Sequence, residues 1–221
     1  MSKLKSLIKK IPSAWYTVLR RTNYALQIKN NRFVSPEKEF PEIRKWISEG
    51  DWVLDIGANV GHYTRAFSSV VGSGRVVALE PHPETFSYLA CNTADLSNVT
   101  LINAAATDSN ELVGFAVPEG NFYTARITKG SERKVLGLQL GALQFPQRIS
   151  FVKIDVEGHE MHVLNSLEDI IQRDSPILMV ENHLAELQNW AAQRGYFFDD
   201  LANSHNHILK PMPDRSTSAN D

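Results

Sequence analysis

Short apolar segments alternate with stretches of helical periodicity along most of this 221-residue chain. The apolar segments lack the polar alternation of a strand with one wet face, as expected when helices cover both faces of a sheet. Expected strands are residues 52–56, 75–79, 99–103, 149–154 and 177–181, and expected helices are residues 62–71, 84–95, 160–173 and 184–194. This rhythm predicts an α/β fold with a mostly parallel sheet and right-handed crossovers.

Two regions depart from the rhythm. Glycines and prolines divide residues 112–148 into short pieces, which predicts a hairpin-rich or loop insertion between the third and fourth strands. Residues 196–198 and 207–209 are expected to close the sheet as a final pair of strands. The length suits one domain, which we place at residues 51–210, with a flexible tail at residues 211–221.

The first 50 residues differ from the rest and are predicted to form an N-terminal helical extension. Apolar residues recur at helical spacing from Leu4 to Ile11, among four lysines, until Pro12 interrupts the pattern. This basic helix would either dock on the protein with a solvated lysine face or make peripheral contact with an anionic membrane surface. A second, more regular amphipathic helix is expected at residues 36–49.

Charge and composition narrow the class of protein. The formal net charge of -2 gives no basic field for a phosphate backbone, so no nucleic-acid partner is expected. The one cysteine, Cys91, excludes an internal disulfide framework and fits a reducing compartment. No apolar run approaches the ~18 residues that a membrane span needs, and no signal-peptide pattern is present. We therefore expect a soluble, cytoplasmic catalytic body.

Acidic and glycine residues follow the first two expected strands, at the sheet edge where ligands bind. The first strand runs into Asp55-Ile56-Gly57-Ala58-Asn59-Val60-Gly61, whose glycines let the backbone approach a ligand closely. The second ends in Glu80-Pro81, and a carboxylate there suits the two hydroxyls of a ribose. A nicotinamide cofactor would use both places, but the turn lacks the middle glycine of Gly-x-Gly-x-x-Gly. The turn therefore favours S-adenosylmethionine, which carries no phosphate and whose ammonium group Asp55 can help to bind.

The fourth strand leads into the most specific string, Lys153-Ile154-Asp155-Val156-Glu157-Gly158-His159-Glu160. Two carboxylates leaving a strand at alternate positions concentrate negative charge, which is costly unless it meets a cation, an acidic proton or a metal. Together with the first turn and the Glu80-Pro81 strand end, this string closely resembles the FkbM family of methyltransferases. The resemblance covers roughly residues 52–183, and the ordered combination of three motifs is specific where each alone is weak.

The resemblance implies a class I methyltransferase (Rossmann-like) fold, with a mostly parallel seven-stranded sheet and helices on both faces. It also implies S-adenosylmethionine as the donor and a hydroxyl of a sugar, glycan or secondary metabolite as the acceptor. Carried over by position, the donor-binding residues would be Asp55, Gly57, Asn59, Gly61, Glu80, Pro81, Ala105 in the segment beside the adenine, and Asp155. One departure is Gly141 after Leu140, where family members often have Leu-Asp, so a carboxylate that helps to shape the acceptor side is missing.

A hydroxyl acceptor must lose a proton during methyl transfer, so a nearby base is expected. The candidates are Glu157, Glu181 and His183, of which His183 titrates closest to working pH and is preferred. Together with Asp155, these side chains could alternatively hold Mg²⁺ or Mn²⁺ to orient a diol-type acceptor, although we assign none of them as a metal ligand. Two other classes of protein stay open: a NAD-type nucleotide-binding oxidoreductase, and a non-catalytic module that keeps the cofactor fold.

Overall fold

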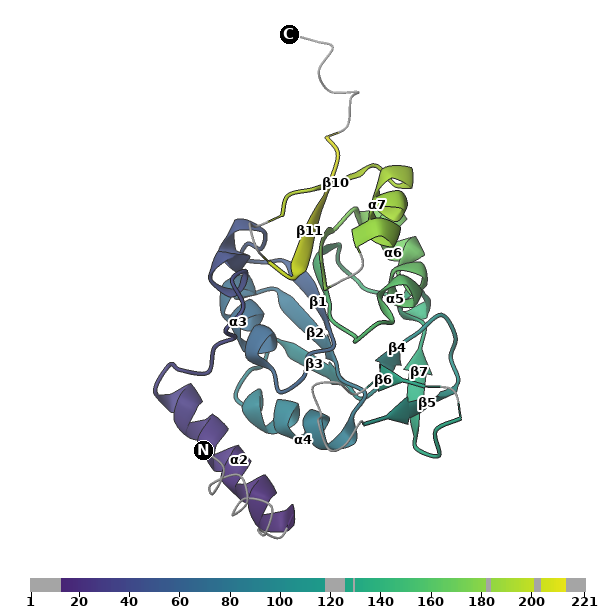
Figure 1. Ribbon diagram of the computed structural model, residues 1–221. Helices are drawn as coiled ribbons and strands as arrows, with labels where there is room; N and C mark the ends of the chain where they lie inside the picture. The colour runs from purple at the N-terminus through teal and green to yellow at the C-terminus, as the bar shows by residue number, and fades with distance from the viewer. Residues whose placement is uncertain (1–12, 118–125, 129, 182–183, 201–203, 214–221) are drawn as a thin grey trace.

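The computed structural model describes residues 13–117, 126–128, 130–181, 184–200 and 204–213 (Figure 1). A seven-stranded sheet lies at its centre, in the order β10-β11-β9-β8-β1-β2-β3. Its strands are β1 (Trp52–Ile56), β2 (Arg75–Leu79), β3 (Val99–Ile102), β8 (Ile149–Ile154), β9 (Ile177–Glu181), β10 (Tyr196–Phe198) and β11 (Asn206–Pro211). All are parallel except at β11, which runs antiparallel to both β9 and β10. The mostly parallel seven-stranded class I fold is thereby confirmed, and Pro211 belongs to the last strand rather than to a tail.

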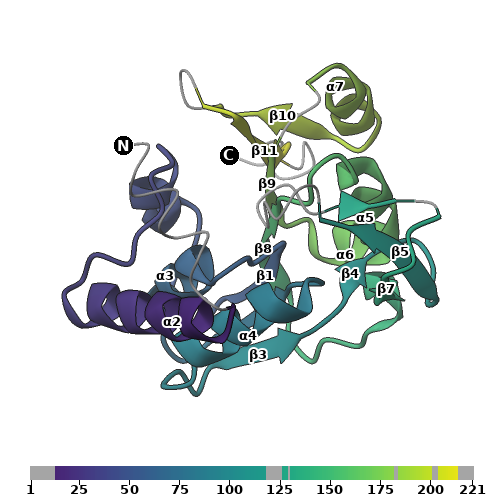
Figure 2. The same cartoon turned by 60° about the horizontal axis from the view of Figure 1, so that its bottom comes forward.

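Helices cover both faces of this sheet (Figure 2). On one face, Phe67 of α3 (His62–Val71) packs with Val53 of β1 and Phe151 of β8, and α4 (Pro83–Asn92) lies beside it. The other face carries α5 (Glu160–Ser166), α6 (Glu168–Asp174) and α7 (Leu184–Gln193). Successive strand residues point to opposite faces, so both layers draw on the same apolar strands. This double burial explains why the strands read as continuous apolar runs.

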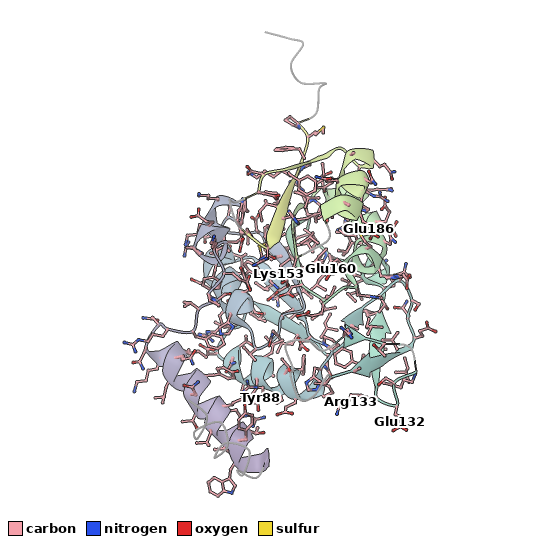
Figure 3. The ribbon with its side chains drawn as sticks, in the orientation of Figure 1. Tyr88, Glu132, Arg133, Lys153, Glu160 and Glu186 are labelled. Carbon is pink, nitrogen blue, oxygen red and sulfur yellow. The ribbon has the colours of Figure 1, made fainter. Side chains whose placement is uncertain are left out.

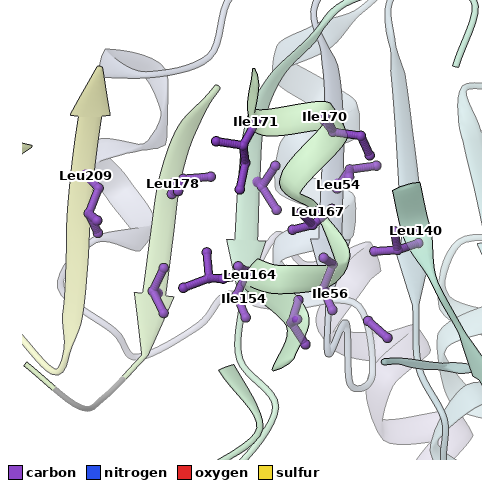
Figure 4. Packing of buried hydrophobic residues seen from close by; sticks show 14 of the residues in the cluster. Leu54, Ile56, Leu140, Ile154, Leu164, Leu167, Ile170, Ile171, Leu178 and Leu209 are labelled. Atoms are coloured by element: carbon purple, nitrogen blue, oxygen red, sulfur yellow. The ribbon is translucent and has the colours of Figure 1, made fainter. Parts of the chain in front are cut away.

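The prediction of one helix over residues 160–173 is wrong, because the chain forms α5 and α6 with a break at Leu167. At the break, the carbonyl of Val163 accepts both from the hydroxyl of Ser166 at 2.8 Å and from the amide of Leu167 at 3.1 Å. Leu164, Leu167 and Ile171 are 0–3% exposed and all pack against the sheet (Figure 4). The break therefore keeps the apolar residues of both halves on the core side.

Residues 36–49 form a 3-10 helix, η1 (Phe40–Lys45), followed by turns, instead of the expected amphipathic α-helix. Phe40, Ile43 and Trp46 are three residues apart, which matches the three residues per turn of a 3-10 helix. Their side chains do face the core: the Trp46 ring stacks on Phe151 at 6.2 Å between centroids. The apolar face was predicted correctly, and the helix type was not.

The helix α2 (Ser13–Lys29) falls within the helical extension expected for the first 50 residues, although neither of the two helices expected there covers its position. It lies along α4 at the edge of the molecule (Figures 1 and 2). Tyr24 of α2 meets Tyr88 of α4 edge to face, with ring centroids 5.8 Å apart. The basic helix predicted from Leu4 to Ile11 lies outside the described residues. No helix within the described ranges is long and apolar enough to cross a membrane.

The insertion between β3 and β8 forms a small second sheet in the order β4-β7-β5-β6, which confirms the expected hairpin structure. Its strands are β4 (Ala105–Ala106), β5 (Leu112–Ala116), β6 (Arg126–Ile127) and β7 (Lys134–Leu138). The short helix η4 (Leu140–Ala142) leads from this sheet back to β8. A Cβ at Gly141 would lie 3.0 Å from the carbonyl oxygen of Ser166, so this position faces α5.

Candidate active site

A cavity of about 460 Å³ lies at the carboxyl ends of β1, β2 and β8. Because β2 and β8 flank β1 on opposite sides, this is the point where the strand order reverses, the usual ligand site in such sheets. Its volume is in the range of small-molecule sites. The predicted site residues that line it are Gly57, Asn59, Glu80, Pro81, Ala105, Asp155, Glu157 and Glu181. Asp55 and Gly61 lie behind this lining, and His183 lies outside the described residues.

The turn after β1 brings backbone, rather than side chains, to the cavity. Gly57 has a φ of 79°, and a Cβ there would lie 1.7 Å from the carbonyl oxygen of Asp155, so only glycine fits between β1 and β8. Asn59 also has a positive φ of 51° and lines the cavity. Gly61 begins α3 with a φ of 97°, and a Cβ there would lie 2.8 Å from Cδ1 of Leu89. Gly61 therefore allows the close packing of α3 on α4.

Glu80 is held in place by two backbone amides. Its Oε2 accepts from the amide of Asn59 at 3.0 Å, and its Oε1 accepts from the amide of His82 at 2.8 Å. Burial raises the pKa of Glu80 to about 7, although both hydrogen bonds favour the charged form. Each oxygen still has a free lone pair, so the carboxylate can accept from two vicinal hydroxyls. Asn103 supports this strand end by donating to the carbonyl of Glu80 at 2.7 Å.

Asp55 is completely buried, one layer below the cavity. Its Oδ2 accepts from the hydroxyl of Thr64 at 2.6 Å, while its Oδ1 has no hydrogen-bond partner within the described part of the chain. Burial raises the pKa of Asp55, and the neighbouring Lys153 ammonium opposes this effect. Oδ1 of Asp55, which has no partner among the described residues and lies below the turn, can attract the cationic end of a ligand in the cavity. Asp155, in contrast, is the carboxylate that lines the cavity itself.

Lys153 supplies the positive charge that the acidic string requires. It lies next to the last residue of β8, near the centre of the molecule (Figure 3), and its Nζ is 2.8 Å from Oδ2 of Asp155. The ammonium also lies 5.1 Å from the ring centroid of Tyr63, and its pKa is raised by Asp155 and Asp55 despite burial. No role was predicted for Lys153, although a lysine inside an apolar strand is a signal that could have identified it.

Glu181 supplies an acidic proton to the same cluster. The hydrogen bond to Asp155, together with burial, raises the pKa of Glu181 to about 8, so Glu181 is the protonated partner at neutral pH. Asp155 remains ionised, because Lys153 lowers its pKa against the effect of burial. The negative charge of Asp155 is therefore balanced by the Lys153 ammonium and by the proton of Glu181. No group of three His, Cys, Asp or Glu side chains with metal-binding geometry occurs among the residues described, and a cation held with His183 stays a prediction.

The N-terminal segment also contributes to the cavity, which sequence analysis did not predict. Ser35, Pro36 and Glu37 line it. Glu37 accepts from the hydroxyl of Tyr63 at 2.7 Å and from the side-chain amide of Asn206 at 3.3 Å. This segment is distant in sequence from all three motifs, and no spacing signal places it there.

The small sheet forms another wall of the cavity, through Phe115, Arg126 and Ile127. It is tied to the end of β2 by Arg133, whose Nη1 lies 2.9 Å from Nε2 of His82 (Figure 3). Burial lowers the pKa of His82, so its ring is neutral. Its Nδ1 accepts from the backbone amide of Thr85 at 3.2 Å and thereby caps the start of α4.

Comparisons with known proteins agree with this geometry. A family model described as the methyltransferase FkbM domain matches residues 55–216. The hexuronic acid methyltransferase AglP of Haloferax volcanii is 29% identical over 140 residues, which cover 61% of this chain and 57% of AglP. This chain thus spans little more than half the length of that curated relative.

The fold also occurs in two solved structures. Methyltransferase FkbM from Methylobacillus flagellatus has a TM-score of 0.55 and 17% identity, over 74% of this chain and 44% of that one. Fibrillarin from Aeropyrum pernix, in complex with natively bound S-adenosyl-L-methionine, has a TM-score of 0.51 and 16% identity, over 75% of this chain and 68% of that one. These similarities show the fold. The family match spans most of the chain and contains all three sequence motifs, so this protein belongs to the FkbM methyltransferase family.

Proposed function

We propose that this chain transfers a methyl group from S-adenosylmethionine to a hydroxyl group of a sugar or glycan. The main support for this proposal is the position of Glu80, a carboxylate that is fixed by two backbone amides and lines a cavity of suitable size. The Gly57 turn beside it admits backbone contact with a ligand. Membership of the FkbM family supports the methyl donor as that ligand.

The lining residues fit the three parts of the donor. Glu80 would accept from the ribose hydroxyls, and the apolar segment Ala104, Ala105 and Ala106 would pack on the adenine. Asp155 and the turn after β1 would hold the amino acid end, with the buried carboxyl group of Asp55 below them. When bound, the donor supplies an electrophilic methyl group on a sulfonium, and the protein aligns the acceptor oxygen with it.

We assign the role of base to Glu181. Glu181 lines the cavity and has a pKa of about 8. Its ionised form therefore accepts a hydroxyl proton more readily than an ordinary carboxylate does. Asp155 and Lys153 hold this side chain in place. Glu157 is the second candidate, since it also lines the cavity and its pKa is raised by burial and by Asp155. His183 remains the choice that sequence alone favours.

Similarity to AglP supports a glycan acceptor, because AglP is a hexuronic acid methyltransferase. Arg126 on the cavity wall offers a cation that could pair with the carboxylate of such a sugar. Glu37, Glu157 and Glu181 also line the cavity and would bound the acceptor side, where they can hydrogen-bond sugar hydroxyls.

Calorimetric titration of the purified chain with S-adenosylmethionine and with its demethylated product tests the donor, and NAD serves as the comparison. We expect both sulfur compounds to bind and NAD to give no heat. Transfer of labelled methyl groups to a panel of hexuronic acids and neutral sugars, with and without chelator, then tests the acceptor and the cation. Binding of NAD alone would favour the oxidoreductase, and donor binding without transfer to any acceptor would favour the non-catalytic module.

A further inference from the structure

The outer face of α2 carries an apolar stripe whose side chains are more than half exposed in the part of the chain that the structure describes. Trp15, Val18, Leu19 and Leu26 are 65%, 54%, 53% and 54% exposed. Their spacing of three, four and eleven residues places all four on one side of the helix. Large apolar side chains gathered in this way on a surface mark a contact with a partner.

The opposite side of α2 already has its partner inside the protein. Tyr24 packs edge to face on Tyr88, and the guanidinium of Arg20 lies 5.8 Å from the same ring (Figure 3). Arg21 donates to the hydroxyl of Ser87 at 3.3 Å. These contacts with α4 fix the helix so that the apolar stripe points away from the body. The stripe is therefore not needed to hold α2 in the fold.

The charge of this part of the chain identifies the kind of partner. Eight Lys and Arg residues and no Asp or Glu precede Glu37, whereas the whole chain has 23 basic and 25 acidic residues. Arg21 and Lys29 are exposed on α2 itself, and Arg32 follows it. A second copy of this chain would bring like charges together, whereas a negatively charged lipid surface is complementary both to the cations and to the apolar stripe.

We propose that α2 docks on an anionic phospholipid surface, with Trp15, Val18, Leu19 and Leu26 inserted at the level of the headgroups. An amphipathic helix with basic flanks and an aromatic residue on its apolar side binds lipid in this way. The chain continues from α2 through Phe33, whose ring packs on His62 at 4.1 Å, directly into the lining residues Ser35 and Glu37. Docking therefore holds the cavity close to the lipid surface. This inference does not depend on the methyl acceptor.

Flotation of the full chain with vesicles tests the proposal. We expect binding to phosphatidylcholine vesicles that contain about a third phosphatidylglycerol, weakening as salt rises, and little binding to phosphatidylcholine alone. Leu19→Glu with Leu26→Glu should reduce the bound fraction roughly tenfold or more, because it removes apolar contact and adds repulsion. The matched control is Leu112→Glu on β5, a leucine that is 67% exposed and distant from α2, which should bind like the natural chain. Circular dichroism melting of both variants shows that they are folded.

Tryptophan emission gives a second measurement. Trp46 and Trp190 are buried and Trp52 is half-buried in β1 of the sheet, so a blue shift on adding anionic vesicles should come from Trp15 and vanish in Trp15→Phe. Equal flotation of the natural chain and the α2 double variant, or no flotation at all, would overturn the proposal. Sedimentation could also overturn the proposal, if the natural chain forms a dimer and only the α2 double variant loses it. If Trp15 emission is already blue-shifted without vesicles, another part of this chain covers the stripe, and the proposal is overturned.

Discussion

Replacing Glu80 with glutamine tests the structural argument most directly, because the change keeps the size of the side chain. The carboxylate now accepts from two backbone amides, those of Asn59 and His82. An amide has one oxygen, so one of these donors would face an NH₂ group instead of an acceptor. Glu80→Gln therefore loses a hydrogen bond inside the protein and a charged acceptor for the ribose.

The size of the effect follows from these lost contacts. Hydrogen bonds to a charged group contribute about 1.5 to 3 kcal/mol, so the dissociation constant of the donor should rise about 10- to 150-fold. Ionisation adds a second signature. Burial raises the pKa of Glu80 to about 7, so the side chain takes up a proton as the pH falls below that value and loses its acceptor character. At pH 6 about one chain in ten is ionised, and the donor affinity of the natural protein should be about tenfold lower than its plateau.

Isothermal titration with S-adenosylmethionine from pH 5.5 to 7.5 measures both effects. The natural chain should bind more tightly as the pH rises through 7, and Glu80→Gln should bind weakly with little dependence on pH. Thermal melting of the variant confirms that it is folded. An unchanged dissociation constant, or the same pH dependence in the variant, would show that Glu80 does not hold the ribose.

Four further substitutions probe the rest of the cavity. Gly57→Ala places a Cβ 1.7 Å from the carbonyl oxygen of Asp155, so it should lower the free energy of unfolding by more than about 2 kcal/mol, and an unshifted urea midpoint would contradict the packing. Lys153→Met should lower the free energy of unfolding by about 2 to 4 kcal/mol. This is less than the loss expected for a fully buried ion pair, because Asp155 is 25% exposed, and Lys153→Arg should recover part of the loss in the same urea titration. Glu181→Gln should remove the increase of the methyl-transfer rate towards pH 8 at saturating donor, while a retained increase would exclude it as the base. His183→Ala should lower turnover far more than donor affinity, and an equal loss in both, compared by rate assay and titration, would assign it a structural role.

The chemistry at the strand ends could be predicted from sequence, because each motif is local. The turn from Gly57 to Gly61 and the Glu80-Pro81 strand end are short segments whose residue types already specify a backbone approach and an acceptor. Since the carboxyl ends of parallel strands share one edge, predicting the sheet also predicted that these segments meet. The cavity does bring Gly57, Asn59 and Glu80 together.

Residues whose role depends on packing between distant segments could not be predicted in this way. Lys153 lies opposite Asp55 on the neighbouring strand, a register that no sequence spacing reports. The position of Glu37 depends on how the N-terminal segment crosses the sheet, where it meets Tyr63 of α3. The break at Leu167 likewise arises from packing, since helical periodicity continues through it. In each case tertiary contacts override a local pattern.

The contact between the segment before η1 and the last strand bears on how this protein can be cut or fused. Asn206 of β11 donates to both Glu37 and Glu39, so the last strand and the segment before η1 hold each other in place. A shortened version spanning residues 51–210 would keep nearly the whole sheet yet lose one side of the cavity, along with the acceptors for Asn206. We expect such a fragment to bind ligands poorly even if it folds, and affinity tags to be tolerated best when they leave residues 35–39 undisturbed.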